Sequence, residues 1–224
     1  MLAEHEDPPK PSSLDAAALP RRLAGEVELR PAPVPARVVG LDCAFLDDRI
    51  LAAAVVWDVA GADVVEERTA SAPLRFPYVP GLLSFREVPV LLTLLRRLTT
   101  PVQGILCDGQ GIAHPRRLGL ASHLGLIAGV PTVGCAKSRL CGTHDDVPST
   151  RGSVAPLRDD GERIGSVLCT RDGVKPVYVS PGHLADHASS VVWVLAMGGG
   201  YRLPEPTRLA DRLVAAEKRR RLGR

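Results

Sequence analysis

The first half of the chain alternates between apolar runs and short polar turns. Residues 37–45, 49–59 and 64–72 have the composition of strands, and the turns between them, at 47–48 and 61–63, are only two or three residues long. Strands joined by such short turns pair antiparallel with their neighbours in the sequence. The pattern therefore predicts an antiparallel meander of three strands.

The second half mixes helical and strand periodicity. Residues 84–99 repeat apolar side chains at helical spacing, and a helix at 117–128 separates two short apolar runs at 104–107 and 131–136. A strand–helix–strand series implies parallel pairing through right-handed crossovers. The remaining expected elements are a hairpin at 162–170 and 175–179 and helices at 14–23, 184–197 and 207–220.

These elements predict an α/β domain. Its mixed sheet combines the antiparallel three-strand meander with parallel strands and is flanked by helices, an order that resembles ribonuclease H-like nucleases. Residues 13–216 form this single domain, whereas the polar, proline-rich residues 1–12 predict a disordered extension. Residues 217–224 predict a basic tail, which either contacts phosphates or is simply a solvated terminus.

Composition narrows the class of protein. The chain has 224 residues, of which 45% are hydrophobic, and a net charge of only +3, so a wholly disordered chain is excluded. The longest apolar run, at 51–57, is far shorter than the roughly 20 residues that span a bilayer, and the acidic N-terminus lacks the apolar core of a secretory signal. Five cysteines without a Cys-x-x-Cys pair disfavour a disulfide framework and a zinc ribbon. We therefore expect a cytoplasmic protein that does not bind membranes.

Three acidic residues stand where an unpaired carboxylate is costly. Asp42 interrupts the apolar run 38–45, Asp108 ends the run 104–107, and Glu87 lies on the apolar face of the expected helix. Burying a lone carboxylate costs several kcal/mol or more unless it is paired or bound to a metal. Three acids that converge from separate elements suit a magnesium site, because Mg²⁺ prefers carboxylate and water oxygens.

Each of these acids also has a purely structural alternative. Asp42 is compatible with an outward-facing position on an edge strand, Asp108 with a turn, and Glu87 with a capping box that begins at Ser84. Pro89 argues against that capping box, because a helix beginning at Ser84 places a residue without an N–H in a position that should donate. We therefore expect the helix to begin nearer Glu87.

Two cationic or titratable candidates accompany the acids. Lys137 ends the apolar run 132–136, where an ammonium group could stabilise charge on a phosphoryl group. His183 opens a helix and could orient or deprotonate water. The alternatives are a surface lysine and a histidine that makes a hydrogen bond at the start of a helix.

Four segments carry a resemblance to a known family. They are FPYVPGLLSFRE at 76–87, DGQGIAHPRRLG at 108–119, GCAKS at 134–138 and YRLPEPTR at 201–208. Through these segments the chain resembles endonuclease V, a repair nuclease that acts at deoxyinosine. The resemblance runs from about residue 37 to residue 216, and the first two motifs are long enough to be specific.

The resemblance implies roles for single residues. In the family the two aspartates that match Asp42 and Asp108 hold the divalent metal, and the glutamate that matches Glu87 completes the acidic centre. The residues that match Lys137 and His183 are implicated in catalysis. Mg²⁺ is therefore the expected cofactor, and Mn²⁺ is expected to substitute for it.

The resemblance also implies how the substrate is held. The family inserts a tyrosine into the duplex beside the lesion, which maps to Tyr78 between the stiffening residues Pro77 and Pro80. An aromatic side chain on a proline-rich loop is a poor core residue and a good unstacking wedge. The extruded base would enter a pocket of backbone groups, and a backbone phosphate would lie nearby. We assign the pocket to Gly81 and Gly111 and the phosphate contact to His114.

The implied reaction is cleavage of the second phosphodiester on the 3′ side of deoxyinosine, leaving 3′-hydroxyl and 5′-phosphate ends. The expected partner is DNA that contains deoxyinosine, bound by a monomer. An inosine-specific ribonuclease and a junction-resolving nuclease are alternatives on the same fold. A module that binds distorted DNA without cutting is disfavoured, because all three acids are present.

Overall fold

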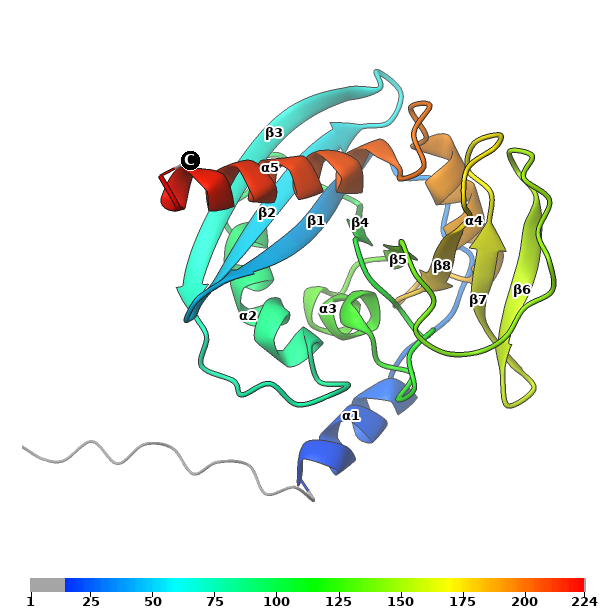
Figure 1. Ribbon diagram of the computed structural model, residues 1–224, viewed down its shortest axis with the longest axis horizontal. Coiled ribbons are helices and arrows are strands. Elements are labelled where there is room, and N and C mark those ends of the chain that lie inside the picture. The colour runs from blue at the N-terminus through cyan, green and yellow to red at the C-terminus, as the bar shows by residue number, and fades with distance from the viewer. Residues whose placement is uncertain (1–14, 224) are drawn as a thin grey trace, which may run out of the picture.

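The predicted meander forms one side of an eight-stranded sheet (Figure 1). The computed structural model describes residues 15–223, and the expected N-terminal extension lies outside them. Strands β1 (Arg37–Leu46), β2 (Arg49–Asp58) and β3 (Asp63–Pro73) pair antiparallel in sequence order, as predicted. The short turns fix this register, so that the apolar runs of β1 and β2 lie side by side.

The parallel part of the sheet follows beside β1. β4 (Gly104–Cys107) pairs parallel with β1, and β5 (Thr132–Ala136) pairs parallel with β4. The full order is β3-β2-β1-β4-β5-β8-β7-β6, in which β8 is antiparallel to β5. The predicted mixed α/β sheet is therefore confirmed. The remaining strands are β6 (Val154–Asp159), β7 (Glu162–Leu168) and β8 (Val177–Pro181).

Strand β6 is an addition to the expected elements. Among the strands of residues 15–223 it pairs only with β7, although Arg158 also forms an isolated bridge with Thr143, and so it forms an edge of the sheet. Pro156 lies within it, which is compatible with an edge strand because one side of the strand needs no ladder donors. The proline and the alternation with charged residues hid this strand from a search for apolar runs.

Helices cover both faces of the sheet. On β2 the side chains alternate, so that Ala52 and its even-numbered neighbours pack under α2 (Ser84–Leu95) and α3 (Leu120–Ala128), whereas Ala53 and its odd-numbered neighbours pack under α5 (Glu205–Arg221). Helix α4 (His187–Ala196) shares the α5 face through Trp193 and Val194, which pack on Val38 of β1 and on β4, β5 and β8. The two faces of β1 and β4 therefore carry different partners, which matters for the site.

Several helix boundaries differ from the prediction. Helix α1 (Asp15–Gly25) continues through Pro20, where an interruption was expected. Helices α3 and α4 begin about three residues later than predicted, and Arg117 has a φ of 55°, which is incompatible with a helix start there. Within residues 15–223, no helix has the length and apolarity needed to cross a membrane.

The C-terminal helix agrees closely with the predicted range 207–220, since α5 runs from Glu205 to Arg221. α5 continues to Arg221, so residues 217–221 of the expected basic tail are helical. Within this last part Glu217 accepts hydrogen bonds from the guanidinium groups of Arg220 and Arg221, at 2.8 and 2.6 Å. These pairs offset part of the positive charge of this segment.

Candidate metal centre and substrate pocket

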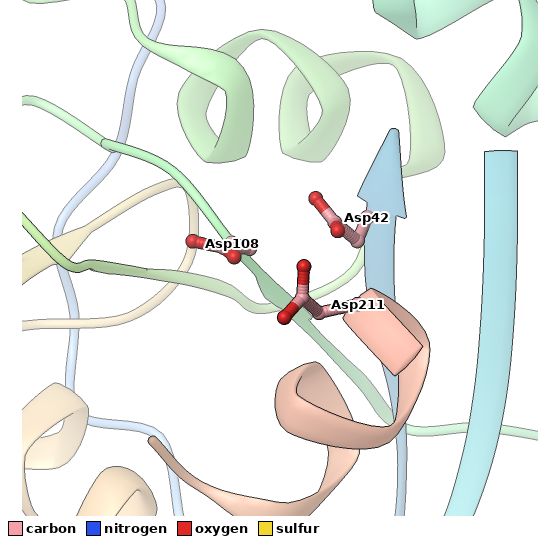
Figure 2. Close-up of side chains that lie close together, drawn as sticks. All are labelled: Asp42, Asp108 and Asp211. Carbon is pink, nitrogen blue, oxygen red and sulfur yellow. The ribbon is translucent and has the colours of Figure 1, made fainter. Parts of the chain in front are cut away.

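Three aspartates meet where the parallel ladder between β1 and β4 ends (Figure 2). Asp42 lies on β1, Asp108 directly follows β4, and Asp211 lies on α5; their closest carboxylate oxygens are all within 4.8 Å of one another. The parallel register explains the first two, because Leu41 lies beside Cys107 and the N–H of Asp108 donates to the carbonyl of Leu41 at 3.0 Å. Asp42 and Asp108 are therefore brought together, as the sequence predicted.

Helix α5 supplies the third aspartate through a close approach of two backbones. A Cβ atom at Gly40 would lie only 2.2 Å from the carbonyl carbon of Pro206, so glycine is needed for α5 to dock this closely on β1. Asp211 follows on the same helix and faces the cluster. The sequence analysis missed Asp211, although it lies beside Ala210 on the buried stripe that also includes Thr207 and Val214.

The cluster concentrates negative charge in a half-buried place. Burial, and then the nearby carboxylate of Asp108, raises the pKa of Asp42 to about 7. Burial also raises the pKa of Asp108, although the ammonium group of Lys137 opposes this effect. Lys137 Nζ lies 2.7 Å from Asp108 Oδ2 and 3.6 Å from Asp211 Oδ1, so the lysine is brought to the cluster as predicted. Carboxylates that repel one another in this way fit a hard divalent cation.

Glu87 reaches the same region from the opposite face of the sheet. Its side chain is buried (9% exposed), and burial, followed by the carboxylates of Asp42 and Asp108, raises its pKa to about 8. Because it projects from α2 rather than from the α5 face, Glu87 is not among the three clustered acids. It is a fourth acid near the centre.

The expected start of α2 was wrong, and so was its capping-box alternative. The helix begins at Ser84 with Pro89 inside it, and its N-cap, Leu83, makes no side-chain hydrogen bond. The hydroxyl of Ser84 instead lies 3.1 Å from Nδ1 of His123 on α3. This contact leaves the carboxylate of Glu87 free of the reciprocal capping bond.

A pocket of about 350 Å³ opens beside the acids. Glu87 and Asp108 line it together with Tyr78, whose side chain is 69% exposed on the loop before α2. Gly81 also lines the pocket and has a φ of 76°, which favours glycine there. The guanidinium of Arg116 donates to the carbonyl of Pro80 at 3.1 Å and so anchors this loop. Pro77, like Pro80, is exposed on the loop.

Two predicted substrate residues have surroundings that differ from the expectation. The N–H of Gly111 donates to Ser180 Oγ at 2.7 Å, and a Cβ atom there would lie 1.8 Å from the carbonyl oxygen of Pro181, so Gly111 serves packing rather than lining the pocket. His114 does line the pocket, but it is buried, and burial together with Arg116 and Arg117 lowers its pKa to about 4. Because its Nδ1 accepts from the N–H of Arg116 at 3.1 Å, a phosphate contact by His114 would use a neutral ring N–H rather than a positive charge.

His183 is not brought to the acidic cluster. Its N–H donates to Thr132 Oγ1 at 2.7 Å, and its Nδ1 accepts from the N–H of Glu28 at 3.2 Å. Thr132 is the first residue of β5, whereas Lys137 follows the last residue of that strand. The histidine therefore lies at the opposite end of β5, where it connects the segment after α1 to the start of that strand.

Clustered carboxylates where the parallel ladder between two central strands ends, beside a lysine, are the arrangement of a metal-dependent nuclease on a ribonuclease H-like fold. The two-sided packing of helices on a mixed eight-stranded sheet agrees with this class of protein.

Comparison with known proteins identifies the family. A family model described as Endonuclease V matches residues 21–212. Endonuclease V of Streptomyces coelicolor is 50% identical over 191 residues, which cover 84% of this chain and 82% of that relative. The crystal structure of endonuclease V from Streptomyces avermitilis matches with a TM-score of 0.90 and 46% identity, covering 95% of this chain and 96% of that one. The chain belongs to the endonuclease V family and is a nuclease, a hydrolase of phosphodiester bonds.

A more distant structure shares the fold alone. Ciona intestinalis endonuclease V, in complex with a 24-mer DNA containing an inosine followed by a ribo-adenosine, matches with a TM-score of 0.78 at 24% identity. The match covers 92% of this chain and 98% of that one.

Proposed function

We propose that this protein is a magnesium-dependent DNA repair endonuclease that recognises deoxyinosine. It cleaves the second phosphodiester 3′ to the lesion and leaves 3′-hydroxyl and 5′-phosphate ends. The observation that carries the proposal is that one pocket joins the exposed Tyr78 to Asp108 and Glu87, with the other two aspartates next to Asp108. A site for an extruded base and a site for phosphodiester chemistry therefore adjoin.

The carboxylates of Asp42, Asp108 and Asp211 would hold the divalent cation. When bound, such a cation offsets the charge of the phosphodiester and lowers the pKa of a coordinated water. The donor set is made of hard oxygen ligands, which suit Mg²⁺ and also Mn²⁺. Burial, and then the repulsion of Asp108, raises the pKa of Asp42, which supports this assignment because a cation would stabilise the ionised carboxylates.

Two other side chains would take part in the reaction, one by transferring a proton and one by balancing charge on the phosphate. Glu87 lines the pocket beside Asp108, and burial raises its pKa to about 8, so its carboxyl gains and loses a proton near neutral pH and would accept one from water when ionised. Lys137 Nζ lies against Asp108 and is placed to balance negative charge that develops on the phosphoryl oxygens. His183 has no part in this scheme, because it lies at the start of β5, whereas Lys137 follows the end of that strand.

Tyr78 would act as the wedge. Its ring is exposed, and the Arg86 guanidinium lies 5.8 Å from its centroid, which supports the ring without burying it. The bond from Arg116 to Pro80 and the glycine conformation at Gly81 hold the loop in place. The base displaced by this wedge would enter the pocket that Tyr78 and Gly81 line.

The test is cleavage of end-labelled 30-mer duplexes that differ only in deoxyinosine or deoxyadenosine at one position. We expect cutting of the deoxyinosine strand in Mg²⁺ or Mn²⁺, none in EDTA, and a nick that DNA ligase reseals without prior end treatment, because its ends are 3′-hydroxyl and 5′-phosphate. A cut elsewhere, or equal cutting of both duplexes, contradicts the proposal. A matched inosine RNA tests the ribonuclease alternative, because preference for it would require contacts to the 2′-hydroxyl.

Two variants of the wedge sharpen this test. Tyr78→Ala should weaken binding to the deoxyinosine duplex in EDTA about tenfold, because stacking on a base contributes about 1–3 kcal/mol. Tyr78→Phe keeps the ring and should bind as the parent does. If the alanine variant binds equally well, Tyr78 is not the wedge.

The proposal also includes that the enzyme is monomeric and cytoplasmic. Sedimentation of its complex with DNA would test the first point, and fractionation of cells would test the second.

A further inference from the structure

Arg202, in the YRLPEPTR segment at 201–208, has no role in the scheme above, yet its side chain reaches the main chain of the site. Arg202 Nη2 donates to the main-chain carbonyl of Lys137 at 2.5 Å and to that of Pro176 at 2.8 Å. Arg202 Nε donates to the carbonyl of Lys175 at 2.9 Å. One guanidinium therefore binds three carbonyls from two separate chain segments.

These carbonyls lie where the ladder between β5 and β8 stops. The last pair of that ladder is Ala136 with Tyr178, so Lys137 and Pro176 lie just beyond it. Arg202 replaces the missing backbone donors and holds the two strand ends together. From the other side, Gln110 Nε2 donates to the carbonyl of Ser138 at 3.0 Å, so two consecutive carbonyls are fixed by side chains.

Arg202 is itself held firmly. Its own carbonyl accepts from Thr170 Oγ1 at 2.6 Å. Within the same segment the Arg208 guanidinium lies 4.1 Å from the centroid of the Tyr201 ring, and its Nε donates to the buried Glu205 at 3.0 Å. The segment leads directly into α5, which carries the third aspartate of the cluster.

The lysine needs such support. The side chain of Lys137 is 43% exposed, and its flexible stem of four carbons can adopt many rotamers. Side-chain packing alone therefore does not define where Nζ lies. We propose that Arg202 is a positioning residue, which fixes the main chain of Lys137 so that Nζ stays against Asp108 and Asp211 during phosphodiester cleavage. This inference rests on the proposed role of Lys137 in the reaction.

Arginine suits this position better than lysine. Its planar fork presents several N–H donors in fixed directions, whereas an ammonium group is a compact charge on a flexible stem. Arg202→Lys should therefore rescue little of what Arg202→Met loses. Arg151 provides a matched control, because it also donates to a main-chain carbonyl, that of Leu195 on α4 at 3.2 Å.

The first experiment observes Lys137 directly, in the metal-free protein. The sequence has four lysines, so a protein labelled with ¹³Cε-lysine gives a spectrum of four signals, and Lys137→Met assigns one of them. We expect Arg202→Met to shift or broaden the Lys137 signal, while Arg151→Met leaves it in place. An unchanged Lys137 signal in Arg202→Met overturns the inference, and the Lys218 signal serves as the internal reference.

The second experiment measures single-turnover cleavage of the deoxyinosine duplex with enzyme in excess. Arg202→Met should reduce the cleavage rate at least about tenfold while binding in EDTA changes less than about twofold. In the Lys137→Met background the same substitution should have an effect below about twofold, because its route to the reaction is already lost. A further tenfold loss in that background overturns the inference.

The two experiments separate this inference from the proposed function. If Lys137→Met cleaves at the parent rate, the proposed role of Lys137 fails, and the lysine spectrum alone decides whether Arg202 orders it. If Arg202→Met does not fold, as judged by thermal unfolding, Arg202→Gln replaces it, because the amide keeps one donor. Equal spectra for Arg202→Gln and the parent then count against the inference.

Discussion

The sheet buries carboxylates in two places, on the edge strand β3 and at the central strands β1 and β4, and their surroundings differ. Near one edge Glu66 on β3 is only 7% exposed, yet it accepts the N–H groups of Thr99 at 3.1 Å and Thr100 at 2.8 Å, and Arg68 pairs with it at 2.9 Å. Burial by itself would raise the pKa of Glu66, but these backbone and side-chain hydrogen bonds lower it to about 2.

At the central strands β1 and β4 the balance is reversed. Burial and the neighbouring Asp108 raise the pKa of Asp42 to about 7, and the Lys137 ammonium does not outweigh them. The comparison teaches that burial of an acid is no sign of function by itself. An acid that is supplied with several donors belongs to the fold, whereas three acids that face one another with a single lysine beside them are suited to a further cation.

Removing one acid of the cluster should have the largest effect. Asp108→Asn should reduce cleavage of the deoxyinosine duplex about a thousandfold or more, because the cation loses a ligand while the wedge and pocket stay intact. Binding in EDTA should change only a few-fold. The measurement is single-turnover cleavage beside a binding titration, with the exposed turn residue varied as Asp48→Asn as control. Retained cleavage would remove Asp108 from the metal site.

The acids at the central strands should also be distinguishable from Glu66 by the pH dependence of stability. The folded pKa values of Asp42 and Glu87, about 7 and 8, lie above their ordinary values of 3.8 and 4.5. Their contribution is therefore complete below about pH 4 and is lost as the pH rises through 7 to 8. For His114 and His123 the folded pKa is lowered from 6.5 to about 4, so their contribution is present above pH 6.5 and is lost as the pH falls.

Above about pH 6.5 the acids alone should therefore dominate this dependence. We expect the unfolding temperature of the metal-free protein to fall between about pH 6.5 and pH 8.5, by an amount equivalent to about 1–3 kcal/mol. Adding Mg²⁺ should flatten this fall, because the cation stabilises the ionised cluster, and Asp42→Asn should reduce it without metal. Differential scanning fluorimetry with EDTA or Mg²⁺ measures both. A fall that Mg²⁺ does not change would argue against cation binding here.

A substitution at Glu66, the acid whose charge is satisfied by hydrogen bonds, should change stability rather than activity. Glu66→Gln removes the charge that the Thr99 and Thr100 N–H groups and Arg68 contact, and should lower the free energy of unfolding by about 1–3 kcal/mol. The cleavage rate per folded molecule should stay unchanged. Urea unfolding and single-turnover cleavage test this pair of outcomes. A loss of activity with unchanged stability would show that the Glu66 site and the aspartate cluster are not separated in function.

Local patterns predicted those parts of the molecule that local interactions determine. The short turns and apolar runs specify the meander, and they made Asp42 and Asp108 stand out as acids within strands. Asp211 could not be found in this way, because its place depends on how α5 docks against Gly40, a contact between residues distant in the sequence. The stripe of buried positions on α5 was the available signal, since Asp211 interrupts it.

The direction of a strand explains the other difference. His183 follows a motif that suggested catalysis, but β8 runs antiparallel to β5 and therefore delivers its C-terminal end to the start of β5. Lys137 lies at the other end of β5, so the two residues are separated by the length of the strand. Sequence spacing does not reveal which edge a strand end reaches when the pairing partner is unknown.

The smallest expected effect tests this placement of His183. His183→Gln removes the Nδ1 that accepts from Glu28, so the free energy of unfolding should fall by about 0.5–1.5 kcal/mol. The single-turnover cleavage rate should stay within about twofold of the parent, and Thr132→Val, which removes the partner hydroxyl, should behave in the same way. Urea unfolding and cleavage of the deoxyinosine duplex give the two readouts. A tenfold slower reaction in His183→Gln with Thr132→Val unaffected would return the histidine to the chemistry, because loss of the shared network would then fail to explain it.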